Sequence, residues 1–116
     1  MRYRNSSYFC EKNKMENLDQ TTWVEKSKND PNAVILDVRT PNECAQGIIE
    51  GAKIHDFFDA EKFINAIDHM DKSKSYYIYC RSGNRSGQAC QIMEQKGFKN
   101  TFNLVGGILE WQGDLV

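Results

Sequence analysis

The sequence predicts an α/β domain with a central parallel sheet and helices on both faces. Segments typical of strands alternate with segments typical of helices along the 116-residue chain, and this alternation favours parallel strands joined by helical crossovers. The stretch Ala33–Val38 is almost continuously apolar, as expected of a strand that is covered on both faces. The length is that of one domain with a single hydrophobic core.

The first 18 residues differ in character from the remainder of the chain. They are polar and irregular, with charges of both signs, so we interpret residues 1–18 as a flexible leader and residues 19–116 as the folded domain. The sequence leaves open whether Met15 is the natural start.

Helix starts are indicated by short polar side chains that can accept a hydrogen bond from the first turn. Thr21 or Thr22 is expected to begin the first helix, and Asp59 a later one. Between them, Thr40 followed three residues later by Glu43 has the spacing of a capping box.

The second half of the chain contains the clearest strand and helix signals. Ser75–Tyr79 is aromatic and β-branched, which favours a strand, and Thr101–Leu104 is read as a last short strand. A helix is expected from about Ser86 to Lys96, before Gly97. Gly51–Ile54 is a weaker strand candidate.

Composition excludes several classes of protein. Lys and Arg number 15 against 16 Asp and Glu, for a net charge of −1, so no overall positive field attracts nucleic acid. The apolar stretches fall short of the roughly 20 residues that cross a bilayer. Because no apolar segment follows the basic residues at the N-terminus, a secretory signal is not supported and a cytoplasmic location is expected.

The four cysteines, Cys10, Cys44, Cys80 and Cys90, match neither a compact disulfide framework nor a zinc site. Their spacing fits no small secreted scaffold, no CxxC pair occurs, and only two histidines are present. We therefore expect reduced thiols, no metal and no cofactor. Cys44 and Cys90 are interpreted as structural, and Cys10 as exposed in the leader.

The segment Cys80–Ser86 is the most informative in the chain. Its thiol follows a predicted buried strand and precedes a helix, at the sheet edge where ligands bind in open parallel sheets. The loop can turn successive backbone N–H groups inward, the helix start adds partial positive charge, and Arg81 and Arg85 add full charges. A thiol in such surroundings ionises readily and is suited to attack an anionic substrate.

These segments together resemble a single-domain rhodanese of the thiosulfate sulfurtransferase family. The resemblance covers about residues 20–113, and four segments carry it in the family order: Val34–Glu43, Gly47–Ala52, Cys80–Ser86 and Gly97–Trp111.

The resemblance implies a mechanism and assigns roles to the loop. The Cys80 thiolate takes the outer sulfur of thiosulfate or a related small anionic donor, and the resulting persulfide passes it to cyanide or to a thiol, a protein thiol included. Arg81 would attract the donor, and Arg85 would brace the loop. The active-site loop is assigned to Arg81, Ser82, Gly83, Asn84, Arg85 and Ser86.

Asp37 and Arg39 are assigned supporting roles. Asp37 is expected to pair with an arginine near the site, or else to cap a turn at the end of its strand. Arg39 is expected to form an ion pair with Glu43. Ile48 and Glu50 stand where the family commonly has His and Pro, and the effect of these departures is left open.

Two alternatives to a sulfurtransferase were weighed. The domain could be a non-catalytic persulfide carrier or a rhodanese-fold binding module, which an intact loop does not separate from an enzyme. A cysteine-based phosphatase is disfavoured. The related dual-specificity phosphatases have five residues between Cys and Arg, whereas only Arg81–Asn84 intervene here, so the loop suits a single sulfur atom better than a phosphate group.

Overall fold

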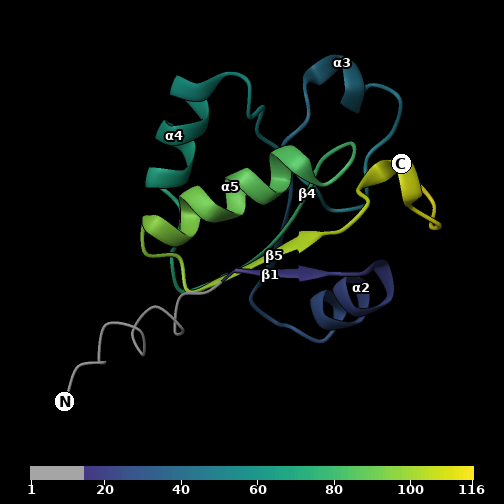
Figure 1. Ribbon diagram of the computed structural model, residues 1–116, viewed down its shortest axis with the longest axis horizontal. Coiled ribbons are helices and arrows are strands. Elements are labelled where there is room, and N and C mark those ends of the chain that lie inside the picture. Colours follow the sequence, from purple (N-terminus) through teal and green to yellow (C-terminus); the bar gives the residue numbers. More distant parts are fainter. Residues whose placement is uncertain (1–14) are drawn as a thin grey trace.

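The protein, shown as a computed structural model that describes residues 15–116, forms a five-stranded sheet (Figure 1). The strand order is β1-β5-β4-β2-β3, and every neighbouring pair is parallel. The strands are β1 (Glu16–Leu18), β2 (Ala33–Asp37), β3 (Lys53–Ile54), β4 (Ser75–Tyr79) and β5 (Asn100–Leu104). The helices are α2 (Gln20–Lys28), α3 (Pro41–Cys44), α4 (Ala60–Asp68), α5 (Asn84–Gln95) and the 3-10 helix η1 (Ile108–Glu110). The predicted α/β architecture is confirmed.

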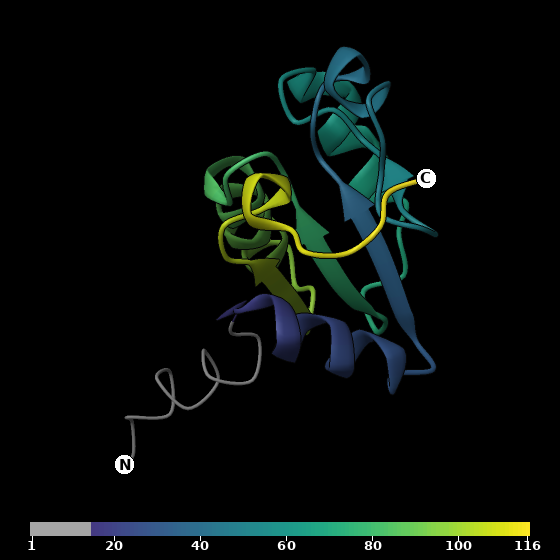
Figure 2. The same cartoon turned by 90° about the vertical axis from the view of Figure 1, so that its right-hand side faces the viewer.

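The central strand β4 separates two apolar layers, and all five of its residues are buried. Tyr76 and Ile78 pack on the side of α4 and α5, whereas Tyr77 and Tyr79 pack on the side of α2. There the ring of Trp23, 1% exposed, meets both tyrosine rings edge-on at 5.9 and 6.2 Å between centroids. Helices therefore cover both faces of the sheet (Figure 2), because side chains alternate along a strand.

Of the three helix starts predicted from capping side chains, two are confirmed and one is wrong; the helix expected from about Ser86 is α5, which begins at Asn84. Thr40 and Glu43 form the expected capping box, and Asp59 caps α4. The cap of α2 is Asp19, whose side chain accepts a hydrogen bond from the backbone N–H of Thr22 at 2.9 Å. Thr22 therefore lies inside the helix as the donor of the capping bond.

The strand β1 lies in the segment that the sequence predicted as a leader. It pairs with β5, with Asn17 opposite Asn103, so residues 16–18 belong to the folded sheet and that part of the leader prediction is wrong. A three-residue strand shows no alternation from which it could be predicted. Met15 donates its backbone N–H to Glu94 at 3.1 Å, and the prediction for residues 1–14, including Cys10, falls outside the described residues.

The strand order places a topological switch point between β4 and β2. The chain leaves β4 toward β5 on one side and leaves β2 toward β3 on the other. Neighbouring parallel strands whose connections diverge in this way leave room for a ligand beyond their carboxyl ends. The segment that follows β4 begins with Cys80. In the part of the chain that the structure describes, none of the helices has the length and apolar character needed to cross a membrane.

Candidate active site

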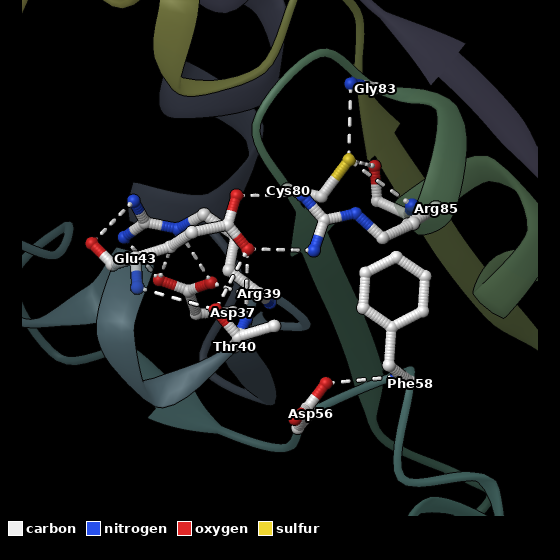
Figure 3. Close-up of polar contacts among 10 residues, drawn as sticks. Asp37, Arg39, Thr40, Glu43, Asp56, Phe58, Cys80, Gly83 and Arg85 are labelled. Atoms are coloured by element: carbon white, nitrogen blue, oxygen red, sulfur yellow. Dashed lines mark hydrogen bonds and ion pairs between the residues drawn. The ribbon is translucent and has the colours of Figure 1, made fainter.

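The sulfur atom of Cys80 is surrounded by hydrogen-bond donors of the loop that follows it. The backbone N–H groups of Gly83 and Ser86 donate to Sγ at 3.1 and 3.4 Å, and the Ser86 hydroxyl lies 3.3 Å from it. Figure 3 shows the sulfur pointing into the turn below Gly83. Cys80 has 0% of its surface exposed, so these donors, rather than water, solvate the sulfur.

The donors lower the pKa of the Cys80 thiol below its usual value. Burial by itself would raise this pKa, but the hydrogen bonds from the Ser86 side chain and from the backbone N–H groups of Ser86, Gly83 and Ser82 outweigh it. A thiolate is the better nucleophile, and the loop shifts Cys80 in that direction, as the sequence analysis expected.

The segment after β5 holds the loop in this orientation. The N–H groups of Ile108 and Leu109 donate to the carbonyl oxygens of Cys80 and Arg81, both at 3.0 Å. In a trans peptide the N–H points away from the C=O. Because the carbonyls of Cys80 and Arg81 point toward η1, the N–H groups of the same two peptide bonds, those of Arg81 and Ser82, point away from η1. Gly107 makes this contact possible, because a Cβ there would lie 2.6 Å from both carbonyl oxygens.

Arg85 braces the loop through an ion pair with Glu43. Two parallel hydrogen bonds of 2.8 Å join its guanidinium to the Glu43 carboxylate, and this pairing holds the pKa of Glu43 down at about 2. The guanidinium carbon also lies 4.8 Å from the centre of the Phe58 ring (Figure 3). The bracing role expected of Arg85 therefore has a contact to support it.

The expected ion pair between Arg39 and Glu43 is wrong, because each side chain has a different partner. Arg39 donates to Asp37 through Nε and Nη2, at 2.7 Å for the shortest contact. Its remaining donors reach the backbone oxygens of Glu43 and Gly47. A buried guanidinium next to a carboxylate two residues away has its charge matched locally, which leaves Glu43 for Arg85.

Both alternatives for Asp37 are realised at once. Its carboxylate pairs with the Arg39 guanidinium, and its Oδ1 also accepts the backbone N–H of Arg39 at 3.0 Å. It thus binds an arginine and caps the turn after β2.

Comparison with known protein families shows to which family this chain belongs. The family model described as the rhodanese-like domain matches residues 20–114. The chain belongs to the rhodanese-like family.

Two relatives of this rhodanese-like chain match it over most of their own length. It is 36% identical over 90 residues to YtwF of Bacillus subtilis, covering 78% of this chain and 84% of that protein. It is 33% identical over 94 residues to a sulfurtransferase of Allochromatium vinosum, covering 81% and 85% of the two chains. Among solved structures, SSP1007 of Staphylococcus saprophyticus superposes with a TM-score of 0.74 at 33% identity, over 88% of this chain and 99% of that one.

The other predicted loop residues of this rhodanese-like domain lie at its surface. Arg81, Ser82 and Asn84 are exposed, so the guanidinium of Arg81 faces solvent beside the loop. Of the two departures from the family pattern, Glu50 is exposed and Ile48 exchanges backbone hydrogen bonds with Val116.

Sequence reasoning missed one residue of the site, Asn103. Its side chain lies among Ser86, Gly83 and Asn17, with contacts of 2.5 to 3.1 Å, and it is 4% exposed. The available signal was a carboxamide between two apolar residues of a buried strand, since a polar group in that position requires partners.

The other two described cysteines are buried, and neither sulfur is surrounded by a comparable set of backbone N–H groups. Cys44 and Cys90 lie in α3 and α5, and burial raises their pKa to about 11 and about 12. Among residues 15–116, no group of three or more His, Cys, Asp or Glu side chains could hold a metal ion.

Proposed function

We propose that this protein is a sulfurtransferase that moves sulfane sulfur from thiosulfate, or a related small anion, to a thiophilic acceptor through a persulfide on Cys80. The observation that carries the proposal is the set of N–H and O–H groups that face a buried sulfur. Cys90 has no comparable set of donors: a contact from the Thr101 side chain lowers its pKa, but burial outweighs that contact. Membership in the rhodanese-like family and a relative named sulfurtransferase support the same chemistry.

The bonds, electrons and charges of the proposed sulfur transfer balance with Cys80, thiosulfate and the acceptor alone. The Cys80 thiolate attacks the outer sulfur of thiosulfate, an S–S bond forms, and the bond between the two sulfur atoms of thiosulfate breaks. Sulfite leaves with the bonding electron pair, so a persulfide anion and a sulfite dianion replace a thiolate and a thiosulfate dianion. An acceptor, either cyanide or a thiol, then attacks the outer sulfur and returns Cys80 to the thiolate.

The loop contributes electrostatic stabilisation at each stage. Inward N–H groups that hold the thiolate can hold the negative outer sulfur of the persulfide in the same way. Arg81, exposed beside the loop, attracts the dianionic donor and the departing sulfite. Arg85, paired with Glu43, keeps the loop in shape. A thiol must stay reduced for this cycle, which the cytoplasm ensures, and we propose that location.

Intact mass measurement tests the nucleophile and the chemistry together. Treatment with thiosulfate should add the mass of one sulfur atom, and cyanide should remove it. Cys80→Ser should abolish the gain, whereas the matched variant Cys44→Ala should retain it. A gain that survives in Cys80→Ser, or no gain in the unmodified protein, would overturn the proposal.

Steady-state turnover with cyanide then separates an enzyme from a carrier. Sulfur loading followed by repeated turnover supports a sulfurtransferase. Loading without turnover identifies a persulfide carrier and contradicts the enzymatic part of the proposal. Release of phosphate from an aryl phosphate, with no sulfur loading, would show a phosphatase instead.

A further inference from the structure

A buried carboxamide lies next to the proposed nucleophile and takes no part in the sulfur transfer described above. Asn103 of β5 reaches toward the active-site loop, and its Oδ1 lies 2.5 Å from the Ser86 hydroxyl oxygen. Its Nδ2 donates to the Gly83 carbonyl at 3.1 Å and to Asn17 at 2.9 Å. Gly87 leaves the space that this side chain occupies, because a Cβ there would lie 3.3 Å from Nδ2.

These contacts determine which end of the Asn103 side chain faces Ser86. A backbone carbonyl such as that of Gly83 can only accept, so the group facing it must be the NH2. The other end, which faces Ser86, is therefore the carbonyl oxygen, and it too can only accept. Two oxygen atoms 2.5 Å apart require a proton between them, and only the Ser86 hydroxyl can supply it.

The Ser86 hydroxyl has a single proton and two acceptors that compete for it. One acceptor is Asn103 Oδ1, at 2.5 Å, and the other is the Cys80 sulfur, at 3.3 Å. When the proton points to Asn103, a lone pair of the Ser86 oxygen faces Cys80, which suits a protonated thiol. When Cys80 ionises, the hydroxyl stabilises the sulfur only by turning away from Asn103.

We propose that Asn103 is a positioning residue that shares the Ser86 proton with Cys80 and thereby limits how strongly the free thiolate is stabilised. The idea rests on the proposed function, in which charge leaves the Cys80 sulfur when the persulfide forms. The hydroxyl then returns to Asn103, so the contact strengthens as sulfur is loaded. Limiting the stabilisation of the thiolate also preserves its nucleophilicity, which falls as the pKa of a thiol falls.

The charged and titratable groups around Cys80 are the same in the wild type and in the uncharged test variants Asn103→Leu, Asn17→Ala and Ser86→Ala. They are Arg81 of the loop, Arg85 and Cys90 of α5, and Glu43 of α3, which pairs with Arg85. The strand β5 itself, residues 100–104, contains no titratable side chain.

The experiment measures the rate at which iodoacetamide alkylates Cys80 as a function of pH, read from the mass of the Cys80 peptide. Asn103→Leu has a similar volume and leaves the Gly83 carbonyl its bond from Gly87 N–H, at 3.1 Å. It should shift the midpoint of the profile downward by about one pH unit, because a hydrogen bond to a charged group is gained. Asn17→Ala, which removes only the outer contact of Asn103, should leave the midpoint unchanged.

A double-mutant cycle shows whether Asn103 acts through Ser86. In a Ser86→Ala background, Asn103→Leu should no longer move the midpoint. A shift of equal size in that background, or an upward or absent shift in the wild-type background, would overturn the proposal.

A second variant keeps the proposal testable if Asn103→Leu fails to fold. Asn103→Asp retains the shape and the accepting oxygen, and its charge competes more strongly for the Ser86 proton, so the midpoint should rise. The rise should shrink in the Ser86→Ala background, and an undiminished rise would count against the proposal. Because alkylation requires no sulfur transfer, these results stand apart from the outcome of the thiosulfate experiment.

Discussion

Cys80 and Cys90 are equally buried and yet differ in their chemistry. Both have 0% of their surface exposed, and both belong to the same apolar cluster between the sheet and α5. Burial raises the pKa of Cys90 to about 12, whereas the pKa of Cys80 is lowered. The difference comes from the donors of the Cys80 loop. The direction of each pKa shift thus depends on what replaces water around the sulfur, more than on how much water is removed.

The two cysteines should differ most in their alkylation by iodoacetamide. In the folded protein near pH 7, Cys80 should react at least about 100-fold faster than Cys90, because the thiolate is the reactive form. The Cys80 rate should fall only as the pH drops through its lowered pKa, while Cys90 stays protonated until about pH 12. Peptide mass spectrometry measures both rates. If Cys80 and Cys90 are alkylated at similar rates in the folded protein, the explanation by loop donors is wrong. In denaturant, where the loop is lost, the two cysteines should react at similar rates.

Disturbing the donors should make Cys80 resemble Cys90. Gly83 has φ +99°, and a Cβ there would lie 3.3 Å from the Gly106 nitrogen and the Leu104 oxygen. Gly83→Ala should therefore displace the amide that faces the sulfur and slow persulfide formation by about 10-fold or more, as loss of one preorganised donor does. Rapid-quench mass measurement gives the rate.

Gly51→Ala is the matched control for that substitution. Gly51 also has positive φ, +85°, but nothing lies within 4 Å of its Cβ position. It should lose a similar amount of stability from backbone strain, of the order of 1 kcal/mol, and load sulfur at the normal rate. Equal slowing in both variants would show that strain, and not the donor, controls the rate.

The exposed charge of Arg81 should affect the binding of thiosulfate more than the reactivity of the Cys80 sulfur. Arg81→Ala should raise the KM for thiosulfate by about fivefold, since an exposed charge contact contributes about 1 kcal/mol, and added salt should reduce the difference. Lys99, exposed just before β5 begins, provides the control, and Lys99→Ala should leave the KM unchanged. Steady-state kinetics at two salt concentrations measures the KM for thiosulfate. An unchanged KM in Arg81→Ala would reject a role of Arg81 in thiosulfate binding.

Loss of the ion pair between Glu43 and Arg85 should have the smallest of these effects, and it should act on the stability of the fold. Glu43→Gln keeps an oxygen for the Thr40 capping bonds but loses the ion pair with Arg85, so the free energy of unfolding should fall by about 1–2 kcal/mol at pH 7. Folding depresses the pKa of Glu43 from 4.5 to about 2. The stability difference should thus be complete above about pH 4.5 and vanish as the pH falls through about 2. Urea unfolding at several pH values measures it, and a difference that does not vary with pH would contradict the ion-pair explanation.

The sequence alone determined the features that depend on neighbours along the chain. The capping box of Thr40 and Glu43, the aromatic and β-branched strand Ser75–Tyr79, and the position of Cys80 between a strand and a helix all follow from local pattern and backbone stereochemistry. The same reasoning could have found Asp19, which stands three residues before Thr22 with the spacing of a cap.

The tertiary structure alone decided which side chains meet. The pairing of Glu43 with Arg85, the strand β1, and the place of Asn103 beside Ser86 join segments distant in the chain. Local patterns contain no information about such contacts, because several partners of suitable charge or polarity are available to each group. The packing of β4 between β2 and β5 brings one partner within reach, and burial then makes that contact obligatory.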